Sequence, residues 1–280
     1  MSPTFRLVLE YDGAQFAGWQ AQAGGARTIQ VALETAILEL SGARVAVVGA
    51  SRTDAGVHAE GQVASLSFDT RLAPAALGRA LNALLPEDVA VRDVALAPEG
   101  FHARRDARSK QYRYAIWNAP ERSPLRARRF WAVPQALDLG AMRIAAAALV
   151  GTHDWSAFQV RGAEWRAEGV AQGRTRSAVR HVTALSVLGV AGGEVWIEVE
   201  GEGFLRQMVR TLVGTLVEVG RGRRDPSSMP ALLESRDRTA AGPTAPAYGL
   251  TLARIDYAPP TLGEGGRISR KIRTLSAQEG

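Results

Sequence analysis

The chain has 280 residues, 46% of them hydrophobic, with no cysteine and a formal net charge of +6. Such a composition supplies a core for one large domain or two smaller ones, and the lack of cysteine excludes disulfides, thiolate catalysis and cysteine-ligated zinc. The first residues lack a signal-peptide core and no apolar run reaches the length of a membrane span, so we expect a cytoplasmic protein with no membrane partner.

Hydrophobic periodicity predicts a β-α-β-β-α-β series in the first hundred residues. Thr28 is positioned to cap a helix with Ile29, Leu33, Ile37 and Leu40 on one face. A second helix is expected over Pro74–Leu85, with proline in its first turn. The expected strands cover Phe5–Glu10, Arg44–Gly49, Gln62–Phe68 and Asp88–Ala97.

The same order of elements recurs in the rest of the chain. Strands are expected over Ser109–Asn118, Arg174–Val190, Glu194–Glu200 and Gly249–Tyr257, and helices over Leu139–Val150 and Phe204–Gly220. Two such series indicate an α+β fold made of two ferredoxin-like halves. The expected domains are residues 1–105 and 106–258, followed by a basic, disordered tail at 259–280. The long connections Gly151–Gly173 and Arg221–Pro246 are predicted to be functional or flexible loops.

Positive charge is concentrated in three segments of the chain. Residues 101–130 carry a local charge of +7, residues 161–180 carry +3 and residues 206–224 carry +4, so the remainder is negative. A surface of evenly mixed charges does not segregate in this way. The distribution favours a basic face that binds a polyanion such as RNA.

One short loop has the composition of a catalytic site. An apolar run at residues 45–48 predicts a strand that enters a stretch rich in Gly, Ser and Thr. Asp54 lies there between small residues that let a ligand approach closely, and Arg52 favours its ionised form. Such a carboxylate is a candidate nucleophile. The alternative is an ordinary turn residue whose side chain bonds to nearby backbone.

Residues 52–59, Arg-Thr-Asp-Ala-Gly-Val-His-Ala, resemble the active-site signature of the tRNA pseudouridine synthase A family. Ser51 stands where that family commonly has Gly. Three further segments resemble family motifs in the same order along the chain. They are Lys-Gln-Tyr-Arg-Tyr at 110–114, Gly-Phe-Leu-Arg-Gln-Met-Val-Arg at 203–210, and Pro-Thr-Ala-Pro-Ala-Tyr-Gly-Leu at 243–250.

The resemblance implies a role for each matching residue. Asp54 would be the catalytic nucleophile, helped by Arg52 and by Arg210 paired with it. Tyr112 would stack on the target base, and Leu250 would form an apolar wall of the pocket. The alternatives from the residues alone are a sheet or core position for Tyr112 and Leu250 and a solvated or phosphate-facing Arg210.

The family's activity is the conversion of uridine to pseudouridine at positions 38, 39 and 40 in the anticodon stem-loop of tRNA. The resemblance implies that the enzyme acts as a homodimer and needs no cofactor. The four histidines have no metal-ligand spacing, so no metal site is expected. The competing hypothesis is a non-catalytic tRNA-binding protein or RNA chaperone that uses the same basic face.

Overall fold

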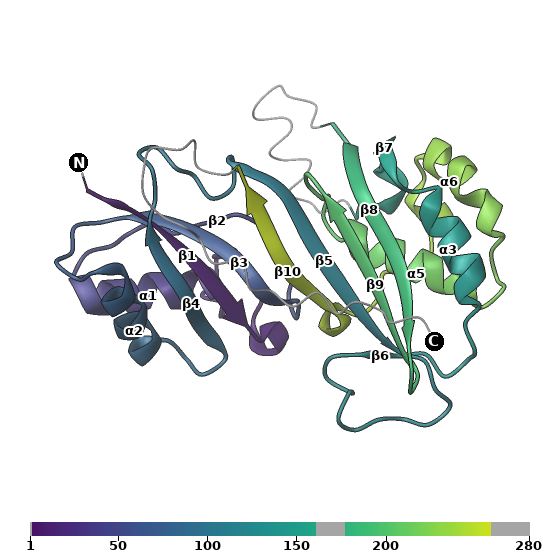
Figure 1. The fold of residues 1–280 in the computed structure, drawn as a ribbon, viewed down its shortest axis with the longest axis horizontal. Helices are drawn as coiled ribbons and strands as arrows, with labels where there is room; N and C mark the ends of the chain where they lie inside the picture. Colours follow the sequence, from purple (N-terminus) through teal and green to yellow (C-terminus); the bar gives the residue numbers. More distant parts are fainter. Residues whose placement is uncertain (1, 161–176, 259–280) are drawn as a thin grey trace.

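A single mixed sheet spans the molecule from one end to the other (Figure 1). The computed structural model describes residues 2–160 and 177–258, and within them the main path of the sheet is β4-β1-β3-β10-β5-β9-β8-β7. The short strands β2 and β6 pair with β3 and β5. The strands are β1 (Thr4–Tyr11), β2 (Val48–Gly49), β3 (His58–Ser67), β4 (Val89–Leu96), β5 (Ala107–Trp117), β6 (Trp131–Ala132), β7 (Gly151–Asp154), β8 (Val179–Val190), β9 (Glu194–Gly201) and β10 (Leu250–Tyr257).

The strand order repeats, which bears out the predicted pair of ferredoxin-like halves. In the first series β4, β1, β3 and β2 lie in the order fourth, first, third, second. In the second series β10, β5, β9 and β8 lie in the same order, with β7 added at the edge. The two series meet where β10 runs parallel to β3, with Thr251 opposite His58 and Leu252 opposite Ala59. The residue boundaries expected for the two domains stay a prediction.

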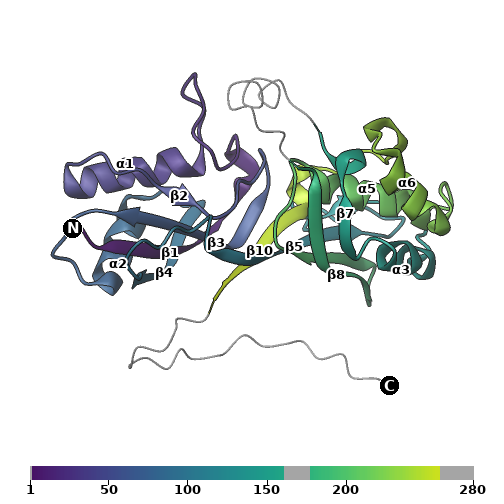
Figure 2. The same ribbon diagram turned by 90° about the horizontal axis from the view of Figure 1, so that it is seen from above.

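Helices flank each series of strands (Figure 2). α1 (Ile29–Ser41) and α2 (Pro74–Leu84) belong to the first, and α3 (Leu139–Ala147), α5 (Met208–Gly220) and α6 (Met229–Ser235) to the second. α1 begins as predicted, because the Thr28 hydroxyl accepts a hydrogen bond from the Val31 N–H at 3.3 Å. α5 is buried along almost its whole length and carries the apolar residues that fill the second core.

Two predicted elements are shorter than the sequence pattern suggests. The strand expected over Arg44–Gly49 is reduced to Val48–Gly49, because side chains of α1 bind the Val47 backbone. Glu34 Oε1 accepts from the Val47 N–H at 3.1 Å, and Gln30 Nε2 donates to the Val47 carbonyl at 3.3 Å. These bonds replace the strand pairing that the β-branched residues of this segment favour.

The helix expected over Phe204–Gly220 begins only at Met208. Gln207 adopts a left-handed backbone conformation with φ +58°, so the preceding residues turn away from the helix axis. Arg206 therefore precedes the helix and does not share a helical face with Arg210, as it would in a helix that began at Phe204.

The helix predicted over Leu139–Val150 ends at Ala147, and the strand predicted from Arg174 is seen from Val179. The two long connections contain structure, namely β7 at the start of one and α6 in the other. Most of Gly151–Gly173 and the whole tail at 259–280 lie outside the described residues.

Candidate active site

Asp54 lies on a tight turn in the loop that joins β2 to β3. We call residues 50–57 the Asp54 loop. Gly56 has φ +78°, a conformation that favours glycine, and the Val57 N–H donates to the Asp54 carbonyl at 3.2 Å. The Asp54 side chain is 29% exposed, so its carboxylate is accessible from solvent while the backbone around it is fixed.

The side chain of a buried glutamine holds this loop in place. Gln62, on β3, is completely buried, and its side-chain oxygen accepts from the Ser51 N–H at 3.1 Å. Its Nε2 donates to the Ser51 carbonyl at 2.7 Å, so both backbone groups of Ser51 are satisfied by one side chain. Leaving such groups unpaired in the interior costs about 1–3 kcal/mol each, so Gln62 fixes the path of the chain ahead of Asp54.

Thr53, next to Asp54, is also held by residues of the first half. Its hydroxyl lies 2.9 Å from the Tyr11 hydroxyl, and its carbonyl accepts from the Trp19 N–H at 3.0 Å. Sequence reasoning missed Tyr11 and Gln62. A signal for the supporting role of Gln62 is present, because an amide side chain stands at a strand position whose neighbours are apolar. Its partner Ser51, however, is eleven positions away in the chain.

Arg210 reaches Asp54 from the second half of the fold. Its Nη1 lies 3.4 Å from Asp54 Oδ2, and its Nε donates to the Ala245 carbonyl at 2.7 Å. The bond to Ala245 orients the guanidinium, whose side chain is only 14% exposed. The structure thus places a largely buried positive charge next to the Asp54 carboxylate.

Arg52 lies differently from Arg210. Its side chain is exposed, whereas its neighbours Ser51 and Thr53 point inward. Among the described residues, no hydrogen bond or ion pair joins Arg52 to Asp54. The structure therefore brings Arg210 to the carboxylate and leaves Arg52 at the surface of the loop.

Tyr112 of β5 makes contact with the same loop. Its hydroxyl lies 2.8 Å from the Ser51 hydroxyl, and the ring meets Phe204 edge to face with centroids 5.3 Å apart. Burial raises the pKa of Tyr112 to about 12, with a smaller rise from the charge of Asp54 and an opposing effect of the bond to Ser51. The phenol is therefore protonated at neutral pH. The ring is only 6% exposed, because Phe204 and the loop cover it.

The segment before β10 closes another side of the site. Leu250 is 5% exposed and lies opposite Tyr114 in the β10–β5 register. The Tyr114 hydroxyl donates to the Pro246 carbonyl at 2.8 Å, which holds this segment against the sheet. Leu250 is thus part of the apolar surroundings of the β5 tyrosines.

His58, the histidine of the signature, is buried and neutral. Its Nδ1 accepts from the Gly13 N–H at 3.1 Å, and its Nε2 lies 3.1 Å from the Tyr248 carbonyl. Burial is the largest cause that lowers the pKa of His58, followed by the charge of Arg129. We therefore treat the 3.0 Å approach of Asp12 as a contact with neutral imidazole rather than as an ion pair. His58 joins the turn after β1 to the segment before β10.

The Asp54 carboxylate thus lies beside the Arg210 guanidinium, and the Tyr112 and Tyr11 phenols contact Ser51 and Thr53 of the same loop. The described residues include no group of three or more His, Cys, Asp or Glu that could hold a metal ion. No helix in the described part of the chain is long and apolar enough to cross a membrane. The chemistry that this arrangement supports is nucleophilic or base catalysis by the Asp54 carboxylate.

Comparison with known proteins agrees with this chemistry. A family model described as tRNA pseudouridine synthase matches residues 7–105 and 145–258. A Myxococcus xanthus protein named tRNA pseudouridine synthase A is 47% identical, covering 94% of this chain and 96% of that protein. Proteins of the same name from Syntrophotalea carbinolica and Ruminiclostridium cellulolyticum are 46% and 41% identical, covering 93% and 90% of this chain and 98% of each protein.

Among solved structures, a Cbf5-Nop10-Gar1 complex aligns with 76% of this chain and 54% of that chain, at 12% identity and a TM-score of 0.31. A similarity of that size is too low to support conclusions about this molecule.

The close packing of α5 against residues 242–245 positions Arg210 and gives a testable prediction. A Cβ at Gly214 would run into the Pro243 carbonyl. Gly214→Ala should lower the free energy of unfolding by about 1–3 kcal/mol, as overpacking does elsewhere. The change in the free energy of unfolding is measured by denaturant unfolding. The control is Gly203→Ala, whose Cβ would meet no atom within 4 Å. Equal effects of the two substitutions would contradict the packing described.

Proposed function

Since this chain belongs to the tRNA pseudouridine synthase family, we propose that Asp54 carries out the isomerisation of uridine to pseudouridine in the anticodon stem-loop of tRNA. The proposed targets are the uridines at positions 38, 39 and 40. The observation that supports this assignment is the accessible Asp54 carboxylate on a fixed turn beside Arg210, 3.4 Å away. The RNA chaperone hypothesis has no support, because the similar proteins are named as synthases.

The reaction rearranges one nucleotide without gain or loss of atoms. The C1′–N1 glycosidic bond breaks, the uracil turns, and a C5–C1′ bond forms. The proton that leaves C5 is balanced by a proton that N1 gains. The isomerisation therefore requires no redox partner or energy cofactor, and the enzyme must supply a base or nucleophile and a site that holds the detached uracil.

Asp54 begins the reaction in one of three ways. It attacks the base, attacks the sugar at C1′, or abstracts a sugar proton to give a glycal. Each route needs the carboxylate in its ionised form, and Arg210 places a positive charge 3.4 Å from it. Each route also needs the target base outside its helix, since stacked and paired atoms are not accessible. Extrusion costs about a few kcal/mol, which contacts to phosphates offset.

Tyr112 is proposed to stack on the extruded base. Its ring is 6% exposed and Phe204 lies edge-on at 5.3 Å, so a stacked uracil requires Phe204 to move aside. Phe204 follows Gly203 and lies between β9 and α5, outside both elements. Leu250 is proposed to exclude water from the same place.

The basic segments are proposed to hold the tRNA backbone. Several of their arginines are engaged within the protein, for example Arg113 with Glu198 at 2.8 Å and Arg129 with Asp12 at 3.1 Å. The arginines at 104, 105 and 108 are exposed on the segment that leads into β5. The segment 161–180 lies for the most part outside the described residues. If these cations bind phosphates, the affinity for tRNA falls as the salt concentration rises.

We also propose that two copies form the active enzyme. Leu188 and Val190 lie on the outer face of β8 and are 46% and 51% exposed. Val187 lies on the other face, toward α3, and is 2% exposed. This outward apolar surface supports the dimer that the family resemblance implies.

Substitution of Asp54 separates chemistry from binding. Asp54→Asn should reduce the single-turnover rate by at least about a thousandfold, because loss of a catalytic nucleophile commonly costs that much or more. The affinity for tRNA should change by less than about tenfold, because many cations share the binding. Rates are measured by pseudouridine mapping and affinities by filter binding. Asp93→Asn, which removes an exposed carboxylate that contacts Arg6, is the control. A substantial rate for Asp54→Asn would refute the mechanism.

Two substitutions of Tyr112 test the stacking role. Tyr112→Phe should retain activity within about tenfold, whereas Tyr112→Leu should lose about 1–3 kcal/mol of stabilisation of the bound base. Single-turnover rates and melting temperatures of both variants are compared with those of wild type. A loss of activity that follows the loss of melting temperature would indicate a purely structural residue. Inactivity of a folded Tyr112→Phe variant would show that the phenol takes part in chemistry.

A further inference from the structure

Lys110 is the one lysine of the described residues, its side chain is half-buried, and the proposed mechanism does not use it. It lies on β5 two residues before Tyr112, so both side chains project from the same face of the strand. Its Nζ donates to the Ala50 carbonyl at 2.9 Å, at the beginning of the Asp54 loop. The chain contains only one other lysine, Lys271, and uses arginine for its remaining side-chain cations.

The surroundings of Lys110 are positively charged. Burial lowers the pKa of Lys110 to about 8, and the charges of Arg104 and Arg180 add to the effect. Arg180 lines an open cavity of about 620 Å³ together with His181 and Glu202. The carboxylates of the flanking strands, Glu200 and Asp256, lie on the opposite face, where they bind Ser109 and Arg254.

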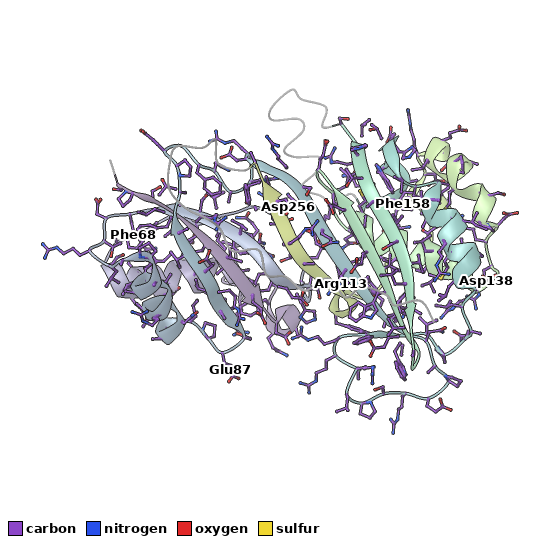
Figure 3. All side chains as sticks on the ribbon, viewed as in Figure 1. Phe68, Glu87, Arg113, Asp138, Phe158 and Asp256 are labelled. Atoms are coloured by element: carbon purple, nitrogen blue, oxygen red, sulfur yellow. The ribbon has the colours of Figure 1, made fainter. Side chains whose placement is uncertain are left out.

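The opposite face is visible in Figure 3, where Arg113 and Asp256 are labelled on the central strands. Ser109 and Arg113 alternate with Lys110 and Tyr112 along β5, and Arg113 pairs with Glu198 on that side. The acidic side chains of these strands are thus directed away from the Lys110 ammonium, which donates to the Ala50 carbonyl on its own side and has Arg104 and Arg180 as its charged neighbours.

We propose that Lys110 is a positioning residue of the proposed synthase, whose ammonium fixes the Ala50 carbonyl and thereby the start of the Asp54 loop. A bond from a charged donor is roughly twice as strong as a neutral one. Ala50 is four residues before Asp54, and small displacements of a catalytic group have large effects on rate. The side chain crosses from the second half of the fold to the loop of the first half, as Arg210 does.

The proposal implies a pH dependence with a definite sign. The ammonium is charged below a pH of about 8 and loses its proton as the pH rises through that value. The neutral amine forms a weaker bond to Ala50, so the rate falls on the alkaline side. The pKa of Tyr112, at about 12, is too high for the phenol to cause this change. Titration of the uracil itself affects the rates of wild type and of every variant alike, so it does not account for a difference between them.

The test compares Lys110→Met and Lys110→Arg with wild type in single-turnover reactions on tRNA at several pH values. Lys110→Met should lower the maximal rate at neutral pH about tenfold, the size expected for a lost bond to a charged group, with KM within about threefold. Lys110→Arg should keep the rate within about threefold of the wild-type rate and remove the part of the decline that begins near pH 8, because guanidinium stays protonated. Arg79→Met, which removes an exposed cation on α2, is the matched control.

The outcomes distinguish this inference from the proposed function on which it rests. A wild-type protein that forms no pseudouridine would refute the function. An active wild type with an unchanged rate in Lys110→Met would refute only the role of Lys110. A raised KM with an unchanged maximal rate would also overturn it, since that indicates a phosphate contact. If Lys110→Met fails to fold, the comparison of wild type with Lys110→Arg decides, and identical alkaline declines would overturn the proposal.

Discussion

The hydrogen bonds that hold the Asp54 loop from both halves of the fold are the constraint on which the site depends. Gln62 of the first half satisfies both backbone groups of Ser51, and Tyr112 of the second half contacts its hydroxyl. Arg210 then reaches Asp54 from α5. Strand pairing between the halves involves only two pairs of residues. The relative position of carboxylate and phenol therefore depends on these side-chain contacts as much as on the sheet.

Burial sets the charge of each group around the loop. Tyr112 is protonated because burial raises its pKa, and His58 is neutral because burial lowers its pKa. Asp54 is more exposed than either of them and has the Arg210 guanidinium beside it. One negative charge among neutral polar groups suits a reaction in which a base or nucleophile must act on an uncharged uridine. A single cation at 3.4 Å balances that charge without enclosing it.

The sequence allowed prediction of the order of elements and of the loop that carries Asp54. Hydrophobic periodicity predicted the positions of the strands because buried residues alternate along them, as Phe5, Leu7 and Leu9 do in β1. The late start of α5 could not be predicted, since Gln207 is not a residue type that signals a left-handed conformation. The shortening of β2 depends on Glu34 and Gln30, which lie on another element.

The supporting residues of the site were harder to predict than the catalytic candidate. The bond from Lys110 to Ala50 spans sixty positions, and local pattern carries no information about such a pair. The exposed position of Arg52 likewise follows from the alternation of the folded loop and not from its nearness to Asp54 in the chain. The roles assigned to Asp54, Arg52, Tyr112, Arg210 and Leu250 stay predictions until the variants are measured.

The most direct measurement of the central claim is a double-mutant cycle between Ser51→Ala and Tyr112→Phe, one residue from each half. Single-turnover rates are determined for wild type, both single variants and the double variant. If the two hydroxyls act as one contact that orders the site, the double variant should be no slower than the slower single variant, which corresponds to a coupling of about 0.5–1.4 kcal/mol when Tyr112→Phe costs no more than about tenfold. Rate losses that simply multiply would show that the contact across the two halves does not order the site.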